Sequence, residues 1–180
     1  MAAMTTLVAV VGSDAAAVIS ATAEMAANVT IETVGEVPER PIEAASVITQ
    51  TWSRARRHGS VYTLVDVDPI GAVVAEWARR LRGEDNDLEV AIGSASGTLP
   101  DYYLVARELP DPEIHWYLGL VRSLSASRVL TSDLVPSAVL GTLSSLPSGK
   151  ELPGAAVLAE QARVWVPLPE LETVGRLLTS

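Results

Sequence analysis

The sequence contains no cysteine and only two histidines, His58 and His115. The absence of cysteine excludes disulfide bonds and thiolate nucleophiles, and it removes the softest metal ligand that proteins use. A chain without cysteine suits a reducing compartment, so we expect a cytoplasmic protein. A hydrolase triad would need one of the two histidines. His58 follows an arginine-rich helix end and His115 lies in a first helical turn, so we interpret both as surface or interface residues.

Long apolar segments are also absent. No stretch approaches the roughly 20 consecutive apolar residues that a membrane-spanning helix needs, so we expect a protein that is not membrane-embedded. No basic residue precedes the short apolar run near the N-terminus, which argues against a secretory signal. Nevertheless, 48% of the residues are hydrophobic and the mean hydropathy is +0.28. We expect this surplus to lie in a sheet buried on both faces or in an interface with another chain.

Positive charge is scarce. The chain has 13 basic residues against 22 acidic ones, a net charge of −9, and Lys150 is its only lysine. A field of this sign repels polyanions, so we do not expect the protein to bind nucleic acid.

What the sequence does contain is an alternation of strand and helix patterns. Apolar runs and period-two alternation predict strands, and apolar residues at helical spacing, bounded by arginine-rich or glycine-containing ends, predict helices. The expected strands are 7–11, 29–37, 60–68, 88–92, 102–108, 128–133 and 163–168. The expected helices are 15–27, 42–57, 69–83, 112–127, 135–146, 155–162 and 169–178.

This alternation is typical of an α/β fold. We predict that residues 1–180 form a single domain, a three-layer αβα sandwich with a mostly parallel sheet. The connection between the expected strands 88–92 and 102–108 is too short for a crossover helix. We therefore expect these two strands to form an antiparallel edge pair.

Two aspartates, Asp66 and Asp68, follow the strongest strand pattern. Carboxylates at alternate positions of a strand end can share a magnesium ion or divide nucleophile and acid–base roles. The segment resembles the D-x-D element of haloacid-dehalogenase-type phosphatases. That resemblance implies a magnesium-dependent phosphohydrolase with Asp66 as nucleophile, Asp68 as acid–base, Ser94 as the second-motif hydroxyl and Lys150 as the lysine. Asp14, at the end of the first strand, is a further candidate metal ligand. The alternative is that Asp68 caps the following helix while Asp66 is solvated or paired with an arginine.

The same residues also resemble a response-regulator receiver domain. In that family an aspartate ends the third strand and a serine or threonine ends the fourth, which corresponds to Asp66 and Ser94. Only Asp14 stands where a receiver has an acidic pair, and no lysine ends strand 128–133. The resemblance therefore implies a receiver-like layout in which phosphorylation is lost.

The segment GSASG, residues 93–97, contains two serines after an apolar run. In a nucleophile elbow the middle residue is the nucleophile, but here it is Ala95, with Ser94 and Ser96 on either side. We interpret the segment as a turn between two strands, close to the Asp66 edge of the sheet.

Because each catalytic motif is incomplete, our leading prediction is a non-catalytic domain that binds a protein partner or a second copy of itself, without a cofactor. Five aromatic residues are the candidate interface anchors: Tyr102, Tyr103, Trp116, Tyr117 and Trp165. Core packing is the alternative role for each of them. A magnesium-dependent phosphohydrolase using Asp66 and Asp68 is the alternative function, so whether the protein is an enzyme stays open. A small-ligand sensor using the loops at Gly12 and Gly93 is the third possibility.

Overall fold

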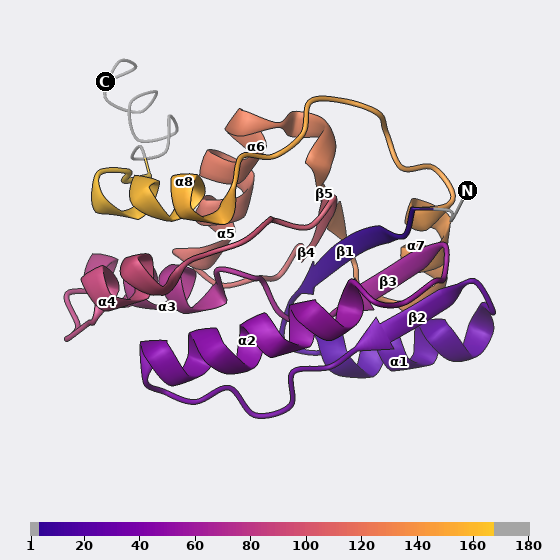
Figure 1. The fold of residues 1–180 in the computed structure, drawn as a ribbon. Helices are drawn as coiled ribbons and strands as arrows, with labels where there is room; N and C mark the ends of the chain where they lie inside the picture. The colour runs from indigo at the N-terminus through magenta and orange to yellow at the C-terminus, as the bar shows by residue number, and fades with distance from the viewer. Residues whose placement is uncertain (1–3, 168–180) are drawn as a thin grey trace, which may run out of the picture.

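The computed structural model describes residues 4–167, which form a parallel β-sheet between layers of helices (Figure 1). The five strands lie in the order β2-β3-β1-β4-β5, and every neighbouring pair is parallel. Their bounds are β1 Thr6–Val11, β2 Val29–Glu32, β3 Tyr62–Val65, β4 Tyr102–Ala106 and β5 Val129–Ser132. The α/β sandwich predicted from the sequence is confirmed.

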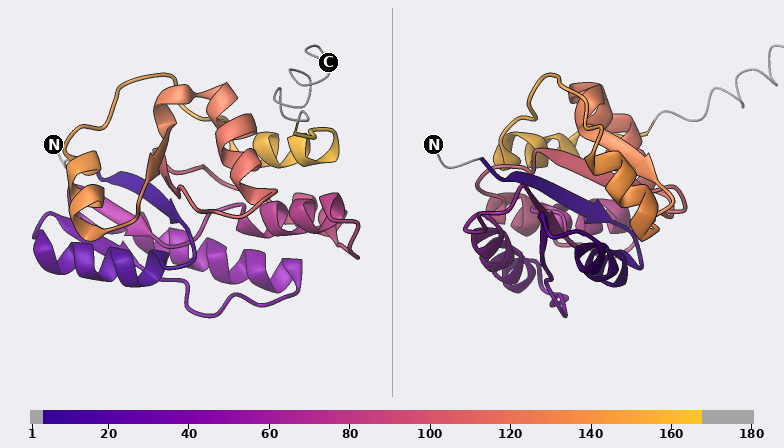
Figure 2. Two further views of the ribbon diagram at one scale, coloured as in Figure 1. Left: turned by 180° about the vertical axis from the view of Figure 1, so that it is seen from behind. Right: turned by 90° about the vertical axis from the view of Figure 1, so that its right-hand side faces the viewer.

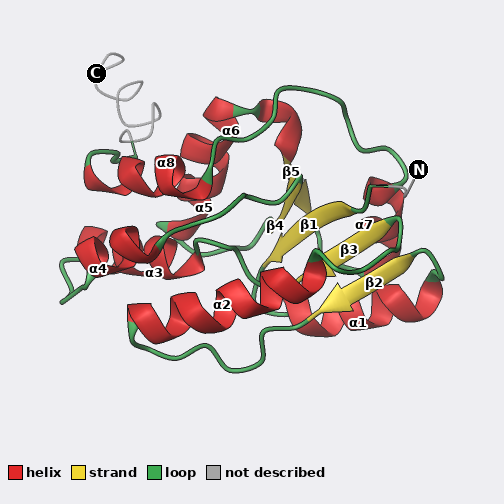
Figure 3. Cartoon of the chain, viewed as in Figure 1, coloured by secondary structure: helices red, strands yellow, loops and turns green. Residues whose placement is uncertain are grey.

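The helices divide between the two faces of the sheet. In the right-hand view of Figure 2, α2 lies on one side and α1 and α7 lie on the other. A further group, α3, α4 and α8, lies beyond the end of the sheet toward which the arrowhead of β2 points (Figure 3). The longer helices are α1 Ala15–Met25, α2 Pro41–Ala55, α3 Gly71–Leu81, α4 Leu88–Ser94 and α7 Pro136–Leu143. The short ones are α5 Glu113–His115, a π-helix η1 Trp116–Val121, α6 Arg122–Leu124, a 3₁₀ turn η2 Ala126–Arg128, α8 Ala155–Glu160 and a 3₁₀ turn η3 Gln161–Arg163.

Alternate strand residues point to opposite faces of the sheet, and helices cover both faces, so both sets of side chains are buried. Val8, Val10 and Leu104 pack with Ile19 of α1 and Val139 of α7. The alternate strand residues Ala9, Tyr103 and Val105 point to the other face of the sheet. There they pack in a second cluster with Leu99, Ile48 and Trp52 of α2, and Leu120 and Val121 of η1. The high hydrophobic content is thus used largely inside the domain.

The expected strand 88–92 is wrong. These residues belong to α4, in which Leu88, Ala91 and Ile92 are buried and Val90 is exposed. Burial at positions i, i+3 and i+4 is helical periodicity, which a five-residue segment with only one polar residue, Glu89, does not distinguish from a strand.

The expected antiparallel edge pair is wrong for the same reason. With α4 in place of a strand, β4 lies between β1 and β5 and is parallel to both. The connection from β3 to β4 is therefore a helical crossover between two parallel strands. It consists of α3, α4 and the irregular segment after Ser94.

The expected strand 163–168 does not form over the residues that are described. Arg163 ends the turn η3, and residues 164–167 are irregular, with Val164 and Val166 exposed. The expected helix 169–178 lies outside the described residues. Within 4–167, no helix combines the length and the apolarity that crossing a bilayer requires.

Candidate functional site

The carboxyl end of β1 is the point at which the winding of the sheet reverses. The chain leaves β1 for α1 on one face, whereas it leaves β3 and β4 for α3 and η1, which pack in the cluster of the other face. In open parallel sheets the crevice outside such a reversal is where ligands bind.

A cavity of about 270 Å³ lies in this crevice, and a second of about 210 Å³ adjoins it. Both are lined by Val67, Gly71 and Ala75, so they lie next to each other at the start of α3, and we call the two together the α3 groove. The first cavity is also lined by Val10, Val11, Gly12, Asp66, Asp68, Val74, Leu109, Glu113 and Tyr117. The second is also lined by Val37, Pro38, Glu39, Pro41, Ala44, Ile48, Ala72 and Glu76.

Asp68 forms the polar floor of the first cavity. Its Oδ1 accepts hydrogen bonds from the Tyr103 hydroxyl at 2.7 Å and from the Ile70 amide at 3.0 Å. Its Oδ2 accepts one from the Tyr117 hydroxyl at 2.7 Å. The three donors come from the β3–α3 loop, from β4 and from the π-helix η1. The carboxylate therefore joins three elements that are distant in sequence.

Burial controls the ionisation of this cluster. Desolvation raises the pKa of Asp68 above its ordinary value, and the hydrogen bonds from Ile70, Tyr117 and Tyr103 offset part of that rise. Burial, reinforced by the nearby Asp68 charge, raises the pKa of both tyrosine hydroxyls well above 10.0. Both phenols consequently stay protonated and remain donors to the aspartate.

Asp66 differs from Asp68 because it is only half-buried and has few partners. Its Oδ1 accepts a hydrogen bond from the Val34 amide at 2.8 Å. Desolvation raises its pKa, and the backbone N–H groups of Val34 and of Asp66 itself lower it in part. Among the described residues no arginine, lysine or histidine pairs with this carboxylate. Asp66 is thus a partly desolvated negative charge at the cavity wall.

Glu113 stands at the start of α5 and already pairs with a cation. Arg82 donates to its two oxygens at 3.2 and 3.5 Å and also pairs with Glu84. Glu113 therefore closes the rim of the cavity through an ion pair with the end of α3.

Gly12 closes the other side of the crevice together with Leu134. A Cβ atom on Gly12 would lie 2.6 Å from Leu134 Cδ1 and 2.8 Å from Ala106 Cβ. Leu134 itself has a φ of 42°, an unfavourable conformation for a branched side chain, and its amide donates to the Ser132 hydroxyl at 3.2 Å. Leu134 thus fills the space beside the carboxyl end of β1 on the α1 side.

We expect Gly12→Ala to lower the free energy of unfolding by about 1–3 kcal/mol, because the methyl group would force Leu134 or the β1–α1 turn to move. Gly141→Ala is the control. Its Cβ would meet nothing within 4 Å, and alanine favours helix α7 over glycine. Urea denaturation of both variants measures the difference. Equal stabilities would contradict the close packing at Gly12.

The structure separates the sequence-derived candidate residues. Asp66 and Asp68 lie together at the first cavity, as expected. Asp14 is exposed at the start of α1 and does not line it, and Ser94 ends α4, where its hydroxyl donates to the Val90 carbonyl. Within residues 4–167 no three histidine, aspartate or glutamate side chains are grouped as metal ligands would be. Asp14 is therefore not grouped with Asp66 and Asp68 in the described part of the chain.

The two family resemblances weaken for specific reasons. Asp68 has both oxygens engaged by buried tyrosine hydroxyls, so it does not offer a free acid–base group beside Asp66. A receiver has the strand order 2-1-3-4-5, whereas this sheet has β2-β3-β1-β4-β5. In addition, Ser94 is the last residue of helix α4 and does not follow the fourth strand. The interpretation of Asp68 as a cap of the following helix agrees better with the structure, because its side chain accepts a hydrogen bond from the Ile70 N–H just before α3.

The loop GSASG lies apart from this crevice. After Ala95 the chain runs to the amino end of the sheet, where Asp101 exchanges two hydrogen bonds with Leu7: its amide donates to the Leu7 carbonyl, and its Oδ2 accepts from the Leu7 amide. The expectation that Ser94 neighbours Asp66 at one edge of the sheet was wrong because it depended on a strand at 88–92.

The five aromatic candidates lie in the interior. Tyr102, Tyr103, Trp116 and Tyr117 are buried, and Trp165 is half-buried, packing against Trp77 and Trp116. Core packing therefore describes these side chains, and they do not form an exposed anchor surface. Two of them serve the crevice directly, since Tyr103 and Tyr117 are the donors to Asp68.

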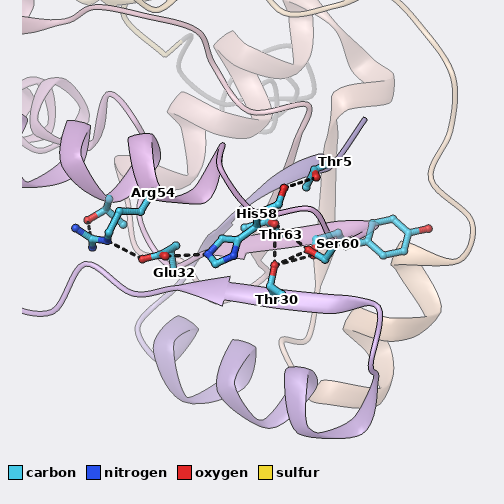
Figure 4. Close-up of polar contacts among 9 residues, drawn as sticks. Thr5, Thr30, Glu32, Arg54, His58, Ser60 and Thr63 are labelled. Atoms are coloured by element: carbon cyan, nitrogen blue, oxygen red, sulfur yellow. Dashed lines mark hydrogen bonds and ion pairs between the residues drawn. The ribbon is translucent and has the colours of Figure 1, made fainter. Parts of the chain in front are cut away.

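A second polar cluster lies at the edge strand β2 (Figure 4). Glu32 accepts hydrogen bonds at 2.9 Å from Arg54 Nε and forms a 2.9 Å contact with His58 Nε2. Burial raises the pKa of Glu32, but the bonds from Arg54 and His58 outweigh it and leave the pKa below its ordinary value. The Thr5 hydroxyl donates to the His58 carbonyl.

The arrangement has an acid, a histidine and nearby hydroxyls, including Thr30, Ser60 and Thr63, which bond to one another. Among the described contacts, none joins the His58 ring to a hydroxyl, so no proton relay is formed. His58, interpreted from the sequence as a surface residue, instead ties the end of α2 to the edge strand.

Sequence reasoning missed the residues that complete the crevice. Tyr103 and Tyr117 were identified as aromatic anchors, but their hydroxyls reach Asp68 across 35 and 49 residues of sequence, and no local pattern signals such a pairing. Glu113 was not among the candidate site residues. A run of small residues, Gly71, Ala72 and Ala75, was the available sign that the start of α3 leaves its surface open.

Comparison of the chain with family models, curated proteins and solved structures finds no match. Fold and geometry define the class: a parallel α/β domain with a groove at the carboxyl ends of its strands. The functional conclusion depends on that groove.

Proposed function

We propose that this protein is a non-catalytic interaction domain that holds a segment of a partner protein in the α3 groove. The observation that carries the proposal is the groove itself. It consists of two adjoining cavities, and Gly71, Ala72 and Ala75 of α3 line it. A contiguous apolar depression with polar residues at its rim is typical of a surface that binds another protein.

The walls of the groove suit an apolar segment. Proline and valine side chains of the β2–α2 connection form one side, and Val37 there is 41% exposed. Ala75 is exposed at the centre and contributes to both cavities. Burying such exposed apolar surface against a partner contributes about 25 cal/mol for each Å² removed from water.

The charges of the groove select the partner. Every charged residue that lines the two cavities is acidic: Glu39, Asp66, Asp68, Glu76 and Glu113. Arg79 pairs with Glu76 and Arg82 with Glu113, so Glu39 and Asp66 are the exposed or half-buried acids there without an ion pair among the described contacts. A chain with a net charge of −9 also repels its own copies. The partner is therefore a different protein whose docking segment is apolar and positively charged, which gives complementary fields across the interface.

A photo-crosslinking side chain at position 75 tests this function in cells that make the protein. We expect it to capture one discrete protein, identified by mass spectrometry. The same side chain at Ala16, which is exposed on α1 on the opposite face, should not capture it. With the purified partner, Ala75→Arg should weaken binding at least tenfold because it fills and recharges the groove, whereas Ala16→Arg should leave the affinity unchanged. Equal capture from both positions, or undiminished binding by Ala75→Arg, would contradict the proposal.

A further inference from the structure

The first cavity of the α3 groove contains a charge that its own surroundings leave uncompensated. Asp66 is partly desolvated beside Val10, Val11 and Val67, and its Oδ1 accepts from the Val34 amide. The other two acids at this cavity are already satisfied. Asp68 receives three hydrogen bonds, and Glu113 pairs with Arg82. Asp66 is thus the one acid at this cavity, among the described contacts, without a cation or a set of hydroxyl donors.

We infer that the first cavity receives a cationic side chain, arginine or lysine, from the partner, and that this side chain pairs with Asp66. The inference rests on the proposed function, because the partner's segment brings the cation into the groove. The apolar walls from β1, α3 and Leu109 would contact the methylene stem while the charged head reaches the carboxylate.

The donor set favours a side chain over a metal ion. A divalent metal ion would need several oxygen ligands, and only Asp66 offers a carboxylate not already engaged. An organic cation needs one carboxylate and an apolar wall, and both are present.

The pairing would also remove an electrostatic penalty of the unbound protein. Half-burial disfavours the ionised form of the Asp66 carboxyl, and an opposite charge within about 4–6 Å favours it. A cation that enters the cavity therefore gains an interaction with a group that water solvates only partly. Such hydrogen-bonded charge pairs are stronger than pairs fully exposed to water.

The test uses the full chain labelled with ¹⁵N and two small probes, n-butylguanidinium and the neutral n-butanol. We expect n-butylguanidinium to shift the amide resonances of Val67, Gly71 and Ala75 saturably, with a Kd in the millimolar range, while n-butanol does not saturate at the same concentrations. Asp66→Asn should weaken guanidinium binding at least fivefold. Its side-chain oxygen still accepts from the Val34 amide, so we expect the fold to persist. Glu24→Gln, an exposed acid on α1, removes the same charge elsewhere and should change the Kd less than twofold.

Equal responses to n-butanol and n-butylguanidinium, or an Asp66→Asn Kd less than fivefold weaker, would overturn the inference. If Asp66→Asn does not fold, the native protein is titrated at decreasing pH. Guanidinium binding should then fall as Asp66 becomes protonated, and constant affinity would overturn the inference.

Failure of the inference and failure of the proposed function give different results. Groove-specific crosslinking at position 75 with no guanidinium binding supports the interaction domain and overturns the cation site. Saturable, Asp66-dependent guanidinium binding with no groove-specific crosslink supports the cation site and overturns the interaction domain.

Discussion

Asp68→Ala should lower the free energy of unfolding by about 3–5 kcal/mol, the largest polar effect that we expect in this domain. The substitution leaves the hydroxyls of Tyr103 and Tyr117 without an acceptor inside the core, and the Ile70 amide loses one as well. Each buried polar group that loses its partner costs about 1–3 kcal/mol. Urea denaturation followed by circular dichroism measures the loss.

Asp68→Asn is the matched control, because its amide keeps an oxygen acceptor in the same shape. We expect it to lose about half as much stability as Asp68→Ala. Asp66→Asn, which keeps the bond from the Val34 amide at a half-buried position, should cost less than about 1 kcal/mol. An Asp68→Ala protein within about 1 kcal/mol of the native one would show that the tyrosine hydroxyls find other partners.

The same aspartate makes the stability depend on pH in a definite direction. Burial raises the pKa of Asp68 in the folded state, so the folded protein holds its proton up to a higher pH than the unfolded chain does. Stability from this group is fully present below its unfolded pKa and is lost as the pH rises through the folded pKa. The stability difference between the native protein and Asp68→Asn, which has no proton to lose there, should shrink over that interval.

Trp77→Ala should also lower the free energy of unfolding by about 3–5 kcal/mol, the usual range for removing a large aromatic side chain from a core. The Trp77 ring lies 5.1 Å from that of Trp116 and 5.5 Å from that of Trp165, and its indole N–H donates to the Trp165 carbonyl. It therefore joins α3 to η1 and to the segment after η3. Thermal and urea denaturation both report this loss.

Val90→Ala provides the comparison for Trp77→Ala, because Val90 is an apolar side chain of α4 that is 42% exposed. Its removal should change the stability by less than about 0.5 kcal/mol. If Trp77→Ala were equally mild, the aromatic cluster would not be what holds α3 to its neighbours. Other contacts of α3 would then have to hold the residues that line the groove in place.

The fold was largely readable from local patterns. Regular alternation and arginine-rich helix ends located the five strands of the sheet and most of the helices, because burial on both faces of a parallel sheet leaves apolar runs in the sequence. Among the described residues, the expected strands 88–92 and 163–168 did not form. The failure at 88–92 arose where a short apolar run satisfies both periods. Leu88, Ala91 and Ile92 are buried as a helix requires, but so few residues do not separate the two patterns.

The site was readable only in part. The position of Asp66 and Asp68 at a strand end indicated the correct edge of the sheet, since parallel strands gather their carboxyl ends there. The order of the strands and the two tyrosine partners were not readable, because they depend on contacts between elements separated by tens of residues. Ser94 was placed beside Asp66 because residues 88–92 were predicted to be a strand, whereas they form helix α4.

Leu134 determines which side of β1 stays open at the carboxyl end of the sheet. The chain turns away from β1 in one direction and from its two neighbours in the other, which creates a crevice on each side of β1. The side chain of Leu134 fills one of them against Gly12, at the cost of an unfavourable backbone angle. A smaller residue at position 134 would leave the space beside Gly12 unfilled. Leu134 thus restricts the open crevice at this end of β1 to the side of the α3 groove.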